Sequence, residues 1–145
     1  MNMYPQSRKV IFTQLVLLVS LLFSGSLFAV VEKEPFTIER FEALQAQNEM
    51  ILVDISASWC PDCAKQQLVL EEYQKDFPES NLRILSIDFD TQKEWVTHFR
   101  APRQSTLLLF SGQNQIWFSV AETRKEKIYE ALNEGWRPAV KPAVK

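Results

Sequence analysis

Three short apolar runs, separated by segments of helical length, limit the folds open to this chain. The runs are residues 50–56, 81–88 and 106–110, and residues 61–77 and 91–101 lie between them. Parallel strands need a connection of a dozen or more residues, and a helix in that connection covers a face of the sheet. The pattern therefore predicts an α/β fold with a central sheet and helices on both faces.

The ends of this pattern complete the expected fold. Ile38, Phe41 and Leu44 are spaced three apart, which predicts a first helix within residues 36–48. Residues 115–120 follow a turn and should pair antiparallel with the third run, which makes the sheet mixed. A final helix is expected to open with a capping box at Thr123 and to end at Gly135.

The two cysteines, Cys60 and Cys63, stand where the first buried strand gives way to a helix. A disulfide across so short a loop stabilises a fold little, so its chemistry is the better explanation. At a helix N-terminus, free N–H groups and the helix dipole favour a thiolate, the reactive form of cysteine. Cys60, nearer the helix start and expected to be more exposed, is predicted to attack, and Cys63 to resolve the mixed disulfide. Asp62 is expected to raise the thiol pKa by repulsion.

The sequence has too few ligands for a structural zinc site held by one chain, because His98 is the only histidine and there is no third cysteine. We therefore predict no metal and no cofactor. Two other classes of function stay open. One is a metallochaperone or metal-binding module in which the two thiolates hold a soft ion such as Cu(I). The other is a non-catalytic binding module that has kept the fold and the disulfide.

The sequence resembles the thioredoxin family over residues 36–136. The resemblance is carried by Ile51-Leu52-Val53-Asp54, Trp59-Cys60-Pro61-Asp62-Cys63 and Thr106-Leu107-Leu108-Leu109-Phe110. It implies a thioredoxin-like fold and disulfide exchange with protein thiols and disulfides. The direction of exchange stays open, because related pairs have potentials from roughly −270 to −120 mV.

The resemblance also implies roles for single residues. Asp54 precedes Cys60 by six residues, the family spacing for a buried aspartate that exchanges a proton with the second cysteine, here Cys63. A carboxyl beneath an apolar sheet should have a raised pKa, which suits that role. The resemblance also implies that Trp59, Gln104 and Ser105 contact the substrate. For Trp59, simple packing is the alternative role.

Three positions depart from the family pattern. Ser105, after Gln104, stands where the family has a cis-proline, so a trans bond is expected there. Its N–H or hydroxyl could then donate to a thiolate, and the site would recognise few partners or admit a metal ion. Asp54 is expected to lack the lysine that some thioredoxins place on the next strand. Ala121 replaces a family glycine.

The N-terminus is typical of an export signal. Arg8 and Lys9 precede an apolar stretch at residues 10–23, and small residues follow up to Ala29. Cleavage after Ala29 is expected, and the alternative is an uncleaved membrane anchor over residues 10–31. The predicted location is the periplasm of a Gram-negative-type bacterium, where a membrane redox partner is a candidate electron donor.

The sequence therefore predicts a signal at residues 1–29, a domain at residues 30–136 and a mobile, proline-rich tail at residues 137–145. Without the signal, 14 basic and 18 acidic side chains remain, a net charge of −4. No basic face for nucleic acid is therefore expected. Membrane contact is expected only if the anchor is retained.

Overall fold

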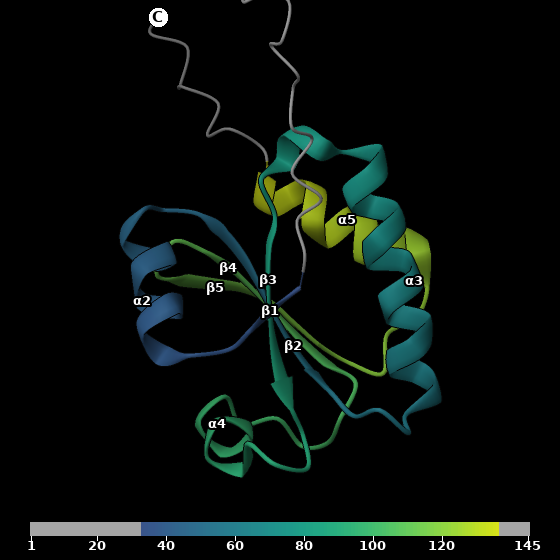
Figure 1. Ribbon diagram of the computed structural model, residues 1–145. Coiled ribbons are helices and arrows are strands. Elements are labelled where there is room, and N and C mark those ends of the chain that lie inside the picture. Colours follow the sequence, from purple (N-terminus) through teal and green to yellow (C-terminus); the bar gives the residue numbers. More distant parts are fainter. Residues whose placement is uncertain (1–32, 137–145) are drawn as a thin grey trace, which may run out of the picture.

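The computed structural model describes residues 33–136, so the predicted signal and tail lie outside the described residues. Five strands form one sheet in the order β1-β3-β2-β4-β5 (Figure 1). The elements in chain order are β1 (Glu34–Pro35), α2 (Ile38–Ala46), β2 (Met50–Ser56), α3 (Pro61–Asp76), the short 3-10 helix η1 (Pro78–Ser80), β3 (Arg83–Asp88), α4 (Lys93–His98), β4 (Thr106–Ser111), β5 (Asn114–Val120) and α5 (Lys125–Trp136).

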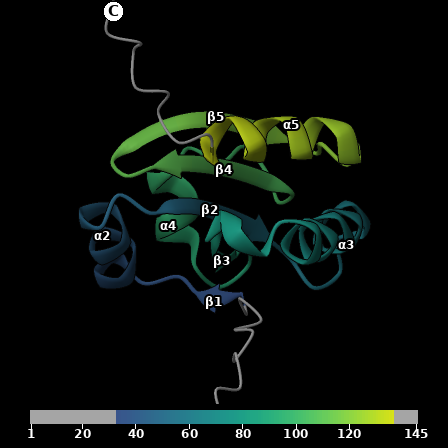
Figure 2. The same cartoon turned by 90° about the horizontal axis from the view of Figure 1, so that it is seen from above.

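The sheet is mixed. Strands β1, β3 and β2 run parallel, whereas β4 pairs antiparallel with both β2 and β5. Seen from above in Figure 2, β1 and β5 lie at the two edges and β2 lies in the middle. Helices α2 and α4 cover one face, and α3 and α5 cover the other (Figure 1). The α/β fold predicted from the sequence is confirmed.

Strand β2 determines which face of the sheet carries the buried carboxylate of Asp54. Successive side chains of a strand point to opposite faces. Val53 accordingly packs with the helix α2 and α4 cluster, and Leu52 packs with the α3 and α5 cluster. Asp54 follows at the next even position, on the face beneath α3. Because residues 50–55 are buried on both faces of the sheet, they are all apolar apart from this one carboxylate.

The first strand, β1, was missed by the sequence analysis, which expected the elements of the domain to begin with the helix within residues 36–48. β1 pairs with β3 through Glu34 opposite Leu85 and Pro35 opposite Ser86. Glu34 also forms ion pairs with Arg40 and Arg83. Two residues are too few to show an alternating pattern, so ion pairing and edge position create a strand that periodicity could not reveal.

Two helix predictions were also wrong at their ends. Helix α4 is shorter than residues 91–101, because Asp88 accepts hydrogen bonds from Thr91 in a preceding turn. Helix α5 begins at Lys125, one residue later than a Thr123 cap would place it. The carboxylate of Glu122 accepts the N–H of Arg124 at 3.0 Å just before the helix.

Gly135 does not end α5 but lies inside it. A Cβ atom there would stand 2.9 Å from Ile116 Cδ1 and 3.0 Å from Leu109 Cδ2. The missing side chain therefore allows the end of α5 to lie close against β4 and β5. The close approach, and not a helix stop, explains this glycine.

Ala121, in the family-glycine position, has a φ of 54° directly after β5. The left-handed region brings the Cβ of an ordinary residue close to the backbone, at a cost of about 1–2 kcal/mol. The N–H of Ala121 donates to the carbonyl of Ser105 at 2.8 Å, which holds the residue in this conformation. The structure thus shows why a glycine would fit this position.

We expect Ala121→Gly to raise the free energy of unfolding by about 0.5–1 kcal/mol, because relief of strain exceeds the added entropy of the unfolded chain. Chemical denaturation measures it. Ala43→Gly, in the exposed middle of α2, is the matched control and should lower stability by up to about 1 kcal/mol. A loss of stability in Ala121→Gly equal to that of the control would contradict the strain argument.

Candidate active site

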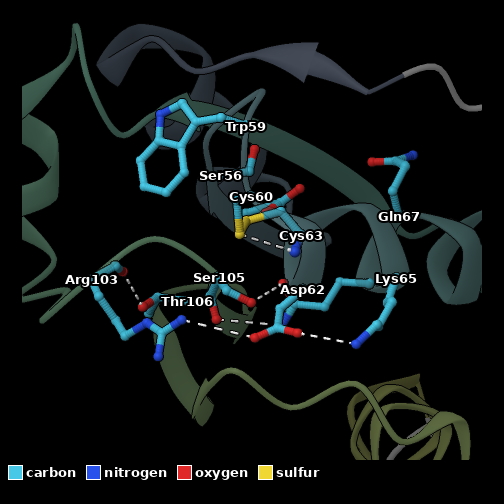
Figure 3. Close-up of a disulfide and its surroundings, with 12 residues drawn as sticks. Ser56, Trp59, Cys60, Asp62, Cys63, Lys65, Gln67, Arg103, Ser105 and Thr106 are labelled. Carbon is cyan, nitrogen blue, oxygen red and sulfur yellow. Dashed lines mark hydrogen bonds and ion pairs between the residues drawn. A yellow bond between two sulfur atoms is a disulfide. The ribbon is translucent and has the colours of Figure 1, made fainter.

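The site begins where β2 ends and α3 starts. Cys60 is the N-cap of α3, and Pro61 occupies the first helical turn, where no N–H donor is needed. Cys60 and Cys63 form a disulfide, with their Cα atoms 5.3 Å apart (Figure 3). The Cys60 Sγ atom accepts the N–H of Cys63 at 3.1 Å. The same N–H would stabilise a thiolate at Cys60 once the disulfide is reduced.

The two cysteines are equally sheltered in this oxidised state. Cys60 is 4% exposed and Cys63 is 7% exposed. The expectation that Cys60 is the more exposed residue was wrong, because Ala57 and Phe89 pack against the disulfide. The distinction between the two sulfurs therefore rests on helix position and not on exposure.

Asp54 lies in the middle of the sheet, in register with Ser86 on β3 and Leu107 on β4. Its side chain is 4% exposed, and its Oδ1 atom is buried without a hydrogen-bond partner. Burial raises the pKa of the Asp54 carboxyl, and the nearby Lys33 ammonium offsets part of that rise. The pKa of Asp54 is thus above its ordinary value of 3.8.

The next strand carries Ser86 opposite Asp54, so the lysine that some thioredoxins place there is absent as expected, but a lysine from another segment pairs with Asp54. The Nζ atom of Lys33 lies 2.6 Å from Asp54 Oδ2. This lysine comes from the residue before β1, and the strand that the sequence analysis searched carries Ser86 in its place. The partner was missed because β1 itself was missed.

Ser105 is fully buried in the loop before β4, and Figure 3 draws it among the residues around the disulfide. No peptide bond in residues 33–136 is cis, so the Gln104–Ser105 bond is trans as expected. The Ser105 hydroxyl donates to Gln66 Oε1 at 2.9 Å. The hydroxyl is therefore committed to α3, which corrects the idea that it donates to a thiolate.

Gln66 was not singled out from the sequence, yet it connects three parts of the site. It is 1% exposed and lies three residues after Cys63 on α3. Its Nε2 atom donates to the carbonyl of Glu122 at 2.9 Å and to that of Ser105 at 3.4 Å. Its position three residues after Cys63 is visible in the sequence, but its burial, which demands partners for its amide, is visible only in the structure.

The acidic residue between the cysteines is balanced by cations. Asp62 lies 3.4 Å from Lys65 Nζ and 3.9 Å from Arg103 (Figure 3). All three side chains are partly exposed, so each pair contributes little to stability. Together they reduce the repulsion that Asp62 alone would exert on a thiolate at Cys60.

Trp59 is a surface residue, so core packing does not explain it. It is 59% exposed, directly before Cys60. Its Nε1–H donates to Asp90 Oδ2 at 2.7 Å, which fixes the indole beside the disulfide. Gln104, the remaining predicted contact position, is half-buried next to Ser105.

Residues 33–136 contain neither a cluster of metal ligands nor a membrane-spanning helix. No three His, Cys, Asp or Glu side chains in that range gather where they could hold a metal ion. In the same part of the chain, no helix has the length and apolar character to cross a membrane.

Comparisons with known proteins agree with this geometry. The family model described as Thioredoxin matches residues 31–134. The crystal structure of Trxlp from Edwardsiella tarda EIB202 is 33% identical, with a TM-score of 0.66 over 70% of this chain and 98% of that one.

Two curated sequences show the same relationship. Thioredoxin of Bacillus subtilis is 29% identical over 98 residues, which cover 68% of this chain and 92% of that protein. A bifunctional thioredoxin reductase/thioredoxin of Mycobacterium leprae is 28% identical over 94 residues, 65% of this chain but only 20% of that enzyme. The chain belongs to the thioredoxin family, and its Cys60–Cys63 pair makes it a thiol–disulfide oxidoreductase.

Proposed function

We propose that this oxidoreductase exchanges disulfides with protein partners in the periplasm, with Cys60 as the attacking thiol and Cys63 as the resolving one. The observation that carries the proposal is the N–H of Cys63 directed at the Cys60 sulfur at the start of α3. A thiolate in this place is stabilised by the helix dipole and by a backbone N–H donor, which favours Cys60 as the attacking sulfur.

The proposed reaction has two thiol–disulfide exchange steps. The Cys60 thiolate attacks a substrate disulfide, which forms a mixed disulfide and releases one substrate thiolate. Cys63 then passes its proton to Asp54 and attacks the Cys60 sulfur, which releases the second substrate sulfur. The substrate disulfide becomes two thiols, and the Cys60–Cys63 pair becomes a disulfide. The reverse sequence oxidises a substrate, and the partner's potential sets the direction.

Asp54 suits the role of proton acceptor because its surroundings resist ionisation. A carboxyl with a raised pKa takes up a proton more readily near neutral pH than an exposed aspartate does. Its unpartnered Oδ1 atom leaves a position open for that proton. The Asp62 carboxylate is partly exposed and paired, so it is less suited to the task.

Substrate contact is proposed for Trp59, Gln104 and Ser105: Trp59 and Ser105 are drawn around the disulfide in Figure 3, and Gln104 is next to Ser105 in the chain. The exposed indole of Trp59 offers an apolar surface next to Cys60. Ser105, held by Gln66 where the family has a proline, supports recognition of a narrow set of partners.

The periplasmic location rests on the signal-like order of residues 8–29, with a mature domain from residue 30 and a tail from residue 137. A pair that reduces partners in an oxidising compartment needs an electron supply. We propose a membrane redox partner for this purpose.

Trapping of partners tests the order of attack. Cys63→Ser should accumulate mixed disulfides between Cys60 and cellular proteins, because the resolving thiol is missing. Cys60→Ser should not. Both are measured on non-reducing gels and by mass spectrometry of the trapped species. Equal trapping by the two variants would show that Cys60 is not the preferred attacking thiol.

The burial of Asp54 predicts a pH-dependent gain in stability. A raised folded pKa means that ionisation above pH 3.8 weakens the native state. Asp54→Asn should therefore raise the free energy of unfolding at pH 7 by about 1–3 kcal/mol, and the gain should shrink as pH falls towards 3.8. Urea denaturation across pH measures it. A gain that is the same in acid and at neutral pH would contradict the assignment to ionisation.

Export is tested on the natural protein. Mass spectrometry of the periplasmic fraction should find a chain that begins at Val30. A membrane-bound chain that keeps Met1 would establish the anchor, and a cytosolic pool would refute export.

A further inference from the structure

The side chain of Lys33 ends at three groups of the active-site face. Its Nζ atom lies 2.6 Å from Asp54 Oδ2 and donates to Ser56 Oγ at 3.4 Å and Gln67 Oε1 at 3.3 Å. Only 27% of the lysine side chain is exposed. An ion pair this sheltered acts on its partner more strongly than a surface pair does.

The sheet register explains how an edge residue reaches the central strand. Pro35 on β1, Ser86 on β3 and Asp54 on β2 are successive partners across the sheet. Partners in register point to the same face, and Lys33 stands two residues before Pro35. Because Ser86 has a short side chain, the long lysine side chain can cross β3 above it.

A second set of contacts fixes β1 in this place. Glu34 accepts hydrogen bonds from Arg40 Nε at 2.7 Å and from Arg40 and Arg83 guanidinium nitrogens. The N–H of Phe36 donates to the carbonyl of Ser86 at 2.9 Å. The two arginines lower the pKa of the Glu34 carboxyl, so it stays ionised near neutral pH. A two-residue strand has few ladder bonds, so this ion-pair cluster supplies much of its attachment.

We propose that Lys33 is a positioning residue for the exchange reaction, held against Asp54 by the Glu34 cluster, so that the segment after the predicted export signal is part of the catalytic unit. The inference rests on the proposed role of Asp54. According to this inference, the edge of the sheet sets the protonation of Asp54. Attachment of β1 decides whether the Lys33 ammonium lies beside the Asp54 carboxyl.

The effect of Lys33 has a definite sign. Its positive charge favours the ionised form of Asp54, which is the form that accepts a proton from Cys63. The register partners of Asp54, Ser86 and Leu107, carry no charge, and α3 brings the neutral Gln67 beside Lys33. Loss of Lys33 therefore leaves burial unopposed and keeps more of the carboxyl protonated at neutral pH.

The test follows the second step alone. Reduced protein is mixed with a chromogenic aryl disulfide in a stopped-flow instrument over a range of pH. Attack by Cys60 releases one coloured thiolate, and attack by Cys63 on the mixed disulfide releases the second. Lys33→Met should shift the pH midpoint of the second release upward by about one unit and slow it about tenfold below that midpoint. The first release should change little.

Companion variants separate charge from structure. Lys33→Arg keeps the charge and should restore the second release. Glu34→Gln should shift the pH profile in the same direction as Lys33→Met but less far, because β1 is held less firmly. The matched control is Glu72→Gln, which breaks the exposed pair with Lys125 between α3 and α5 and should leave the profile unchanged.

Three outcomes overturn different claims. If Asp54→Asn does not slow the second release, the proposed role of Asp54 fails. If Asp54→Asn slows it but Lys33→Met has a wild-type profile, the role of Asp54 stands and the inference on Lys33 is wrong. A Glu34→Gln profile equal to that of Glu72→Gln would refute the attachment by the Glu34 cluster.

Discussion

The burial of one carboxylate, Asp54, is the constraint to which the rest of the site is adjusted. It occupies the face of β2 beneath α3, in a strand whose other fully buried residues are all apolar. Burying a carboxyl with one oxygen unpartnered costs stability. A group that weakens the fold at the strand leading to a redox-active disulfide is best explained by the reaction. Lys33 reduces the cost without removing it.

The start of α3 supplies the groups that act on the Cys60 sulfur. The helix places a backbone donor on the Cys60 sulfur, and the cations around Asp62 limit the repulsion from that residue. Gln66 then ties the helix to the loop before β4 through Ser105. Side-chain hydrogen bonds, each contributing about 1 kcal/mol, thus hold a loop that a proline ring shapes elsewhere in the family.

The sequence was sufficient for the parts of the fold that repeat a pattern. Apolar runs located β2, β3 and β4, and the spacing from Asp54 to Cys60 placed both residues correctly beneath and at the start of α3. Two contacts could not be predicted, because they join residues that only folding brings together. Lys33 meets Asp54 across β3, and a helix and a loop distant in the chain bring Gln66 to Ser105. Neither contact leaves a periodic signal.

The most direct measurement is a titration of the Asp54 carboxyl in the reduced protein, followed by carbon NMR of the labelled side chain. The account predicts a pKa above 3.8 and a change in the titration when Cys63 is replaced by Ser, because the two groups share a proton. A carboxyl that titrates at or below 3.8, with no response to Cys63→Ser, would contradict the account.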